Sequence, residues 1–284
     1  MTWKPISKIP VWIKAVFLGL FVVIAVTGVW SLLVGLNISI TPRIPWSFGA
    51  MGIVLWLVWK YLRGSGPPAS TSETRREWLR AGKVRKDKRL FGYAAAGLYG
   101  VTLLQLIVIT TRLTDFTPGQ VEQIERASAY PAVTVIALIL MASLVAGFAE
   151  EAGFRGLMQR PLELEYGPAI GITVTALVFA LIHLPNATIA PHTIPIFFAG
   201  SIGWGLLAYL TESIRPGIVV HFLVDAVAFF WVWRNLHAAK ALGSESVLNS
   251  GADAAFLLQL LVFAVSLFVL AILFLRLRKI PDRP

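Results

Sequence analysis

Long stretches of the chain carry no Asp, Glu, Lys or Arg, and this hydrophobic patterning predicts most of its structure. An α-helix of about 20 apolar residues crosses a bilayer, and most of these stretches are close to that length or longer. The longest holds 46 residues and contains Pro185, Pro191 and Pro195, so it predicts two spans joined by a tight connection. The charge-free runs are 15–42, 44–59, 90–111, 127–149, 166–211 and 254–275.

A further span is expected at 217–235, although it contains His221 and Asp225. The pattern therefore predicts an all-α polytopic membrane protein of about eight transmembrane helices, forming a single membrane domain over residues 1–284. Strands of a membrane β-barrel alternate polar and apolar residues, and these runs do not. The expected spans are 12–36, 44–62, 90–111, 131–158, 168–184, 194–212, 217–235 and 254–275.

The basic residues are distributed unevenly between the predicted loops. With the N-terminus inside and eight crossings, 20 of the 25 Lys and Arg residues face the cytoplasm. Cytoplasmic loops of membrane proteins carry such an excess, so both termini are predicted to lie inside. The first apolar run is longer than that of a signal peptide and lacks a small-residue cleavage site. We therefore expect it to be a retained anchor.

Composition agrees with this class. The chain is 57% hydrophobic and 14% charged, with a mean hydropathy of +0.74, whereas soluble domains are roughly 25% charged. The absence of cysteine excludes disulfides, thiolate nucleophiles and Cys-ligated zinc. A net charge of +10 on a membrane protein indicates contact with anionic lipid, and we expect no nucleic-acid partner. Together with the positive-inside bias, the small Cys-free chain favours a prokaryotic plasma membrane.

Residues 63–89 carry nine basic and three acidic side chains and begin Arg-Gly-Ser-Gly-Pro-Pro. Gly, Ser and Pro favour a flexible linker. The basic residues that follow favour a juxtamembrane helix near anionic headgroups on the cytoplasmic side. The alternative is a docking site for a protein or an acidic substrate. We expect the linker and the lipid contact.

Ionisable residues inside spans are costly and usually line a functional site. Glu151 and Arg155 are four residues apart and can pair on one helix face. Glu150 points about 100° away from Glu151 and has no partner in its own turn. A free carboxylate in a partly dry site suits a general base.

Two histidines on other predicted spans extend this candidate site. His183 lies near the end of one span, and His221 precedes Asp225 by four residues on another. If the helices on either side of residues 166–168 form an antiparallel hairpin, Glu150 and His183 are equally distant from the turn. We therefore expect these two side chains to lie side by side.

These residue types leave two hydrolytic chemistries open. In one, Glu150, His183 and His221 hold a divalent metal such as zinc that activates water. In the other no cofactor is required, because a carboxylate and a histidine activate water while other polar groups stabilise the oxyanion. The helical His-Glu-x-x-His signature of zinc proteases is absent, since no two histidines are four residues apart.

The three clusters together resemble the family of CAAX proteases and bacteriocin-processing enzymes (CPBP, or Abi), which includes the type II CAAX prenyl endopeptidases. The family pattern is Glu-Glu-x-x-x-Arg, then Phe-x-x-x-His, then His-x-x-x-Asn or Asp, on three transmembrane helices. The resemblance covers about 130–235, the expected catalytic helix core. The matching motifs are Glu150-Glu151-x-x-x-Arg155, Phe179-x-x-x-His183 and His221-x-x-x-Asp225.

This resemblance implies an intramembrane endopeptidase in which Glu150 and His183 activate the attacking water. It also implies that Glu151 and Arg155 hold the site in shape, while His221 and the last residue of the third motif stabilise the tetrahedral intermediate. The substrate implied is a membrane-associated or lipidated peptide, such as a prenylated protein.

Asp225 stands where the prenyl endopeptidases have Asn. An ionised Asp cannot donate a hydrogen bond, so we expect Asp225 to orient His221 or to bind a metal rather than to stabilise an oxyanion. Two other functions are open on the residues alone. The chain is then either a non-catalytic scaffold or immunity protein of the same fold, or a transporter that relays protons through Glu and His.

Overall fold

Each predicted span corresponds to a helix in a computed structural model, which describes residues 9–113, 118–185, 193–234, 247 and 251–281. The described residues contain no strand, which confirms the all-α class. The predicted tight connection at 186–192 lies outside the described residues. The apolar helices are α1 (Val11–Ile40), α2 (Trp46–Leu62), α4 (Lys86–Leu113), α6 (Ala132–Glu150) continued by the π-helix η3 (Glu151–Met158), α8 (Pro168–Leu181), α9 (Ile194–Thr211), α10 (Arg215–Arg234) and α13 (Ala254–Lys279).

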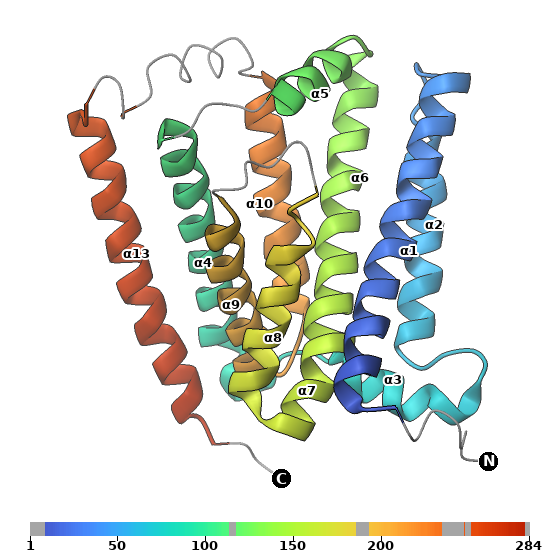
Figure 1. Ribbon diagram of the computed structural model, residues 1–284, viewed down its shortest axis with the longest axis vertical. Coiled ribbons are helices and arrows are strands. Elements are labelled where there is room, and N and C mark those ends of the chain that lie inside the picture. Colours follow the sequence, from blue (N-terminus) through green and yellow to red (C-terminus); the bar gives the residue numbers. More distant parts are fainter. Residues whose placement is uncertain (1–8, 114–117, 186–192, 235–246, 248–250, 282–284) are drawn as a thin grey trace.

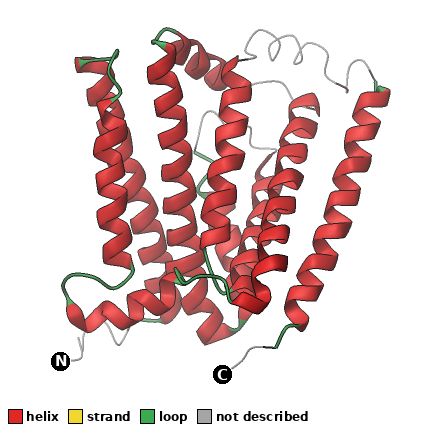
Figure 2. Ribbon diagram, turned by 180° about the vertical axis from the view of Figure 1, so that it is seen from behind, coloured by secondary structure: helices red, strands yellow, loops and turns green. Residues whose placement is uncertain are grey.

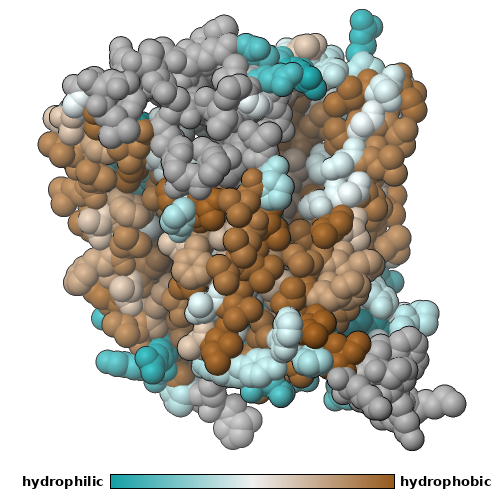
Figure 3. Space-filling view, viewed as in Figure 1, coloured by the Kyte–Doolittle hydropathy of each residue, from teal (hydrophilic) through white to brown (hydrophobic). Residues whose placement is uncertain are grey.

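Six of the helical stretches described are long and apolar enough to cross a membrane, namely α1, α4, α9, α10, α13 and the stretch that runs from α6 to Tyr166. Helices α2 and α8 are apolar but shorter, with 17 and 14 residues. Figure 1 shows the long helices standing side by side, with α1 beginning at the end of the bundle where α13 ends. Hydrophobic residues dominate the middle of the visible surface, and hydrophilic residues gather towards its ends (Figure 3). The number of crossings and the orientation stay predictions.

Short helices close the end of the bundle where α1 begins. The helix α3 (Ser72–Leu79) follows the single turn η2 (Ala69–Thr71) and lies across this end (Figure 2). The helix α7 (Gln159–Tyr166) follows η3 at the same end, whereas α5 (Pro118–Ser128) precedes α6 at the opposite end (Figure 1). These helices explain how the chain returns between spans.

The predicted linker at 63–89 is folded over part of its length because one arginine organises it. The guanidinium of Arg75 is buried and donates to the carbonyls of Tyr61, Ser65, Gly66 and Pro68 at 2.6–3.3 Å. Its charge also lies 4.0 Å from the centre of the Tyr61 ring. Composition alone indicates flexibility here, but these bonds close the Gly- and Pro-rich stretch into a loop.

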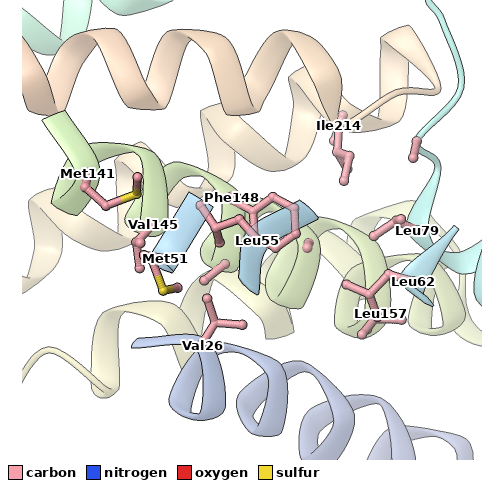
Figure 4. Packing of buried hydrophobic residues seen from close by; sticks show 14 residues of the cluster. Val26, Met51, Leu55, Leu62, Leu79, Met141, Val145, Phe148, Leu157 and Ile214 are labelled. Atoms are coloured by element: carbon pink, nitrogen blue, oxygen red, sulfur yellow. The ribbon is translucent and has the colours of Figure 1, made fainter. Parts of the chain in front are cut away.

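The main hydrophobic core joins α1, α2 and α6 to η3 and the short helix α3 (Figure 4). Val26 of α1 and Met51 of α2 pack with Phe148 of α6, and Leu79 of α3 is fully buried at the edge of the same cluster. The end of α6 is therefore surrounded by protein, and the helix that continues it, η3, is also buried along its whole length.

Helix α1 crosses η3 at a pair of glycines. A Cβ atom on Gly19 would lie 2.8 Å from the carbonyl oxygen of Gly153, and one on Gly153 would lie 2.7 Å from the carbonyl oxygen of Gly19. The two backbones approach this closely only because both residues lack a side chain. Helix α1 thus supports η3 directly.

Gly19→Ala is expected to destabilise the protein by about 1–3 kcal/mol, because the added methyl group overpacks this crossing. The measurement is the free energy of unfolding in detergent micelles. Gly28→Ala is the matched control in the same helix, since a Cβ atom at Gly28 meets no atom within 4 Å. Equal effects of the two substitutions would contradict the role assigned to the glycine crossing.

Candidate functional site

His221 lies at the centre of a group of three carboxylates. Its Nδ1 atom is 3.4 Å from Glu151 Oε1, and its Nε2 atom is 3.7 Å from Glu150 Oε2 and 3.6 Å from Asp225 Oδ2. The imidazole also stacks on the ring of Trp204, with centroids 5.0 Å apart and planes 15° from parallel. The structure therefore brings the first and third predicted motifs together.

Helix α10 approaches α6 closely enough for these contacts because Gly147 has no side chain. A Cβ atom there would lie 3.0 Å from the backbone nitrogen of Phe222 and 3.3 Å from the Cβ atom of His221. One turn of α6 later, the chain reaches Glu150 and Glu151. Sequence spacing left Glu150 without a partner in its own turn, and the structure supplies one from α10.

The change from α-helix to π-helix occurs between the two glutamates. Glu150 ends α6 and Glu151 begins η3, in which backbone hydrogen bonds span five residues instead of four. Both carboxylates lie within 4 Å of the same imidazole despite being adjacent in the chain. Such π-helical turns are frequent at functional sites.

The expected pairing of Glu151 with Arg155 is present inside the protein. The Arg155 Nε atom lies 3.7 Å from Glu151 Oε1, and neither side chain is exposed. The guanidinium also lies 5.1 Å from the centre of the Phe179 ring. Removing either partner would leave an uncompensated buried charge, which is strongly destabilising. The pair thus holds the first motif in one arrangement.

Phe179 fixes the orientation of His183 just beyond the end of α8. The His183 Nδ1 atom lies 2.7 Å from the Phe179 carbonyl oxygen. A carbonyl only accepts hydrogen bonds, so Nδ1 carries the proton and the neutral ring keeps its lone pair on Nε2. The imidazole stacks on Phe197 with centroids 4.5 Å apart, while the Phe179 ring contacts Phe154 of η3 edge-on.

Direct contact between Glu150 and His183, expected from the hairpin argument, is not seen. Within the described parts of the chain no ion pair joins them, and Glu150 faces His221 instead. The His183 ring instead contacts the carbonyl of Phe179 in α8 and the ring of Phe197 in α9. Among the residues described, no three His, Asp or Glu side chains form a group that could hold a metal ion. The predicted ligands Glu150, His183 and His221 are therefore not grouped in the described residues, and metal binding by them stays a prediction.

Two of the three carboxylate side chains are partly exposed. The exposed fraction of the side chain is 16% for Glu150 and 22% for Asp225, but 0% for Glu151. Glu150 thus combines partial exposure with a position beside an imidazole, surroundings that suit a general base. Glu151 is fully enclosed by the protein.

Three residues around the site escaped the sequence analysis. Trp204 stacks on His221, and the Tyr99 ring packs edge-on against Trp204 with centroids 4.6 Å apart. Gly217 gives Glu151 its space, because a Cβ atom at this position would overlap the carboxylate. An aromatic residue or a glycine in an apolar span carries no sequence signal that separates such a role from ordinary packing.

Comparison with known proteins identifies the segment that holds all six predicted site residues. Residues 132–227 match the family model described as type II CAAX prenyl endopeptidase Rce1-like. This segment is similar to the CAAX prenyl endopeptidases. It confirms the resemblance carried by the three motifs and extends from the start of α6 into α10.

The similarity to this family and the apolar helices together support a protease-type enzyme that is integral to a membrane. No curated protein and no solved structure matches the chain. Helices α1, α2, α3, α4 and α13 lie outside the matched segment, although α1 and α3 contact η3 within it.

Proposed function

We propose that the protein is an intramembrane endopeptidase that hydrolyses a peptide bond of a membrane-associated or lipidated substrate. The observation that carries this proposal is the partly exposed carboxylate of Glu150 beside His221 among apolar helices. Within a CAAX-protease-like segment, this arrangement suits activation of water better than transport or a purely structural role.

In the proposed mechanism Glu150 accepts a proton from water as the water oxygen attacks the carbonyl carbon of the substrate. His183 accepts a second hydrogen bond from this water through Nε2, the nitrogen that its bond to Phe179 leaves without a proton. The proton held by Glu150 then passes to the leaving amine when the tetrahedral intermediate collapses. A positioned base of this kind contributes about 10²–10⁴-fold to the rate.

His221 stabilises the oxyanion of the intermediate by donating from Nε2. Asp225 and Glu151 lie on either side of the ring, 3.6 and 3.4 Å from its two nitrogens, and fix its orientation. Asp225 then acts through His221 and does not itself need to donate a hydrogen bond. Glu151 and Arg155 keep their mutual arrangement and so fix the starting point of η3.

The substrate class follows from the location of the site within apolar helices. A peptide whose lipid or transmembrane segment stays in the bilayer can present its cleavage site there, and prenylated C-termini belong to this class. Exposed basic residues between α3 and α4 and in the first turn of α4 fit anionic headgroups. They are Lys83, Lys86 and Arg89.

The proposal is tested by cleavage of a mixed panel of prenylated and leader peptides by the purified protein in proteoliposomes, followed by mass spectrometry. His183→Ala is expected to lower cleavage by about 10²-fold or more. Leu177→Ala, a change at a half-exposed residue of the same helix, is the control and should cleave normally. A chelator should leave cleavage unchanged, because the described side chains do not form a metal site.

Two outcomes would contradict this scheme. Unchanged cleavage by His183→Ala would remove that residue from the mechanism, and loss of cleavage with chelator would replace glutamate chemistry by metal chemistry. If wild type cleaves no peptide, ion flux across the same proteoliposomes that disappears in Glu150→Gln would favour a transporter. Absence of both activities would favour a non-catalytic scaffold.

A further inference from the structure

Residues 79–82, which we call the strap, run from the end of α3 to the segment before α4 and contact both η3 and the turn before α10. One side of the strap touches η3. A Cβ atom on Gly156 of η3 would lie 3.2 Å from the Leu79 Cα atom, and Leu79 itself is fully buried. The strap belongs to the part of the chain outside the matched segment 132–227.

The side chain of Arg80 ties the strap to η3 and α7. Its guanidinium donates to the backbone carbonyl of Arg155 at 2.8 Å and to both carboxylate oxygens of Glu163 at 2.9 and 3.3 Å. Both charged side chains are buried, with exposed fractions of 5% and 2%. Gln159 donates to the same carboxylate at 2.6 Å and to the Gly205 carbonyl at 2.9 Å. This buried network fixes the end of η3 that carries Arg155.

The backbone of the strap ties it to α10, the helix that carries His221. Three successive carbonyls of the strap accept hydrogen bonds from the turn that begins α10. The bonds run from Ile214 N to Arg80 O at 3.1 Å, from Arg215 Nε to Ala81 O at 2.7 Å and from Ser213 Oγ to Gly82 O at 2.6 Å. One short segment thus contacts the supports of both Glu151 and His221.

Arg80 adopts a backbone conformation that reflects these constraints on both sides. Its φ angle is +49°, in the left-handed region that non-glycine residues rarely occupy. Such a conformation costs about 1–3 kcal/mol and persists only where the surrounding contacts impose it. The contacts of the side chain with η3 and of the backbone with α10 supply this constraint.

We propose that Arg80 is a positioning residue that sets the separation of η3 from α10, and thereby the contact of Glu151 with His221. This inference rests on the proposed function for its kinetic consequence. Loss of the guanidinium would release the end of η3 while leaving the catalytic groups chemically intact. A displacement of this size far from the reacting atoms can lower a rate by about 10²-fold.

The kinetic test compares Arg80→Gln with Arg80→Lys, Ser213→Ala and Arg76→Gln in the cleavage assay. We expect Arg80→Gln to lower kcat by about 10- to 100-fold with little change in KM, because the substrate contacts are unchanged. Arg80→Lys keeps the charge and should recover part of the rate. Arg76→Gln removes an exposed arginine of α3 and should behave as wild type.

A second measurement is independent of any substrate. The chain contains no cysteine, so spin labels can be placed at Leu164→Cys in α7 and Val219→Cys in α10, both exposed positions. Their distance distribution should shift or broaden in Arg80→Gln and stay unchanged in Arg76→Gln. If Arg80→Gln does not fold, Arg80→Lys and Ser213→Ala should show the same change to a smaller degree.

The two measurements separate the two proposals. An unchanged distance distribution in the Arg80 and Ser213 variants would overturn the positioning role, whatever the activity. A raised KM with unchanged kcat would also overturn it, because the strap would then act on substrate binding. A shifted distribution in a protein that cleaves nothing would support the positioning role and count against the proposed protease.

Discussion

Glu150→Gln is expected to lower kcat by about 10³-fold without loss of the fold, because glutamine has the same shape but cannot accept the proton from water. Glu151→Gln, in contrast, is expected to lower the stability of the fold. Its carboxylate is fully buried against Arg155, and removing one partner of a buried pair destabilises a protein by about 3–5 kcal/mol. The measurements are kcat in the cleavage assay and thermal unfolding of the same preparations in detergent.

These adjacent glutamates serve as controls for each other. They have the same chemistry, lie on the same turn and contact the same histidine, so a general effect of losing a negative charge would appear in both. Equal losses of stability would show that Glu150 is structural. Full activity of Glu150→Gln would exclude it as the base.

Gly217→Ala should inactivate the enzyme by displacing the side chain of Glu151. The new methyl group would overlap the Glu151 carboxylate, which must then withdraw from His221 or from Arg155. Misplacement on this scale lowers rates by about 10²-fold. The expected result is a loss of kcat together with a lower unfolding temperature, measured as above.

A compensating change tests this explanation. Glu151→Asp shortens the acid by one methylene group, so the double variant Gly217→Ala with Glu151→Asp should recover part of the stability lost in Gly217→Ala. Gly200→Ala is the control glycine, because its Cβ atom would meet its nearest neighbour at an ordinary 3.7 Å. If the double variant is no more stable than Gly217→Ala, the loss of stability does not come from the overlap with Glu151.

The helices were predictable because a bilayer requires long apolar runs, and charged residues flank these runs in the sequence. The pairing of Glu151 with Arg155 was also predictable, since i,i+4 neighbours on a helix lie on one face. The π-helix was not predictable from composition. Its hydrogen-bond register is shifted by one residue, which changes the direction of side chains without changing their polarity pattern.

Two expectations differed from the structure for identifiable reasons. The alignment of Glu150 with His183 assumed straight α-helices on both sides of the turn, whereas η3 interrupts one of them and Phe197 holds the His183 ring. The linker at 63–89 reads as flexible from its glycines and prolines. Arg75 donates to four backbone carbonyls. Sequence patterns do not predict such side-chain-to-backbone bonds.

The glycine crossing of α1 with η3 bears on how the protein can be divided. A fragment cut at residues 132 and 227 would keep every motif residue but would lose α1 from the surface of η3. It would also lose the guanidinium of Arg80, which donates to both oxygens of the buried Glu163 carboxylate. Such a fragment would expose apolar helix faces and would break this buried ion pair. The smallest part of the chain that can fold around the site is therefore larger than the segment that holds its motif residues.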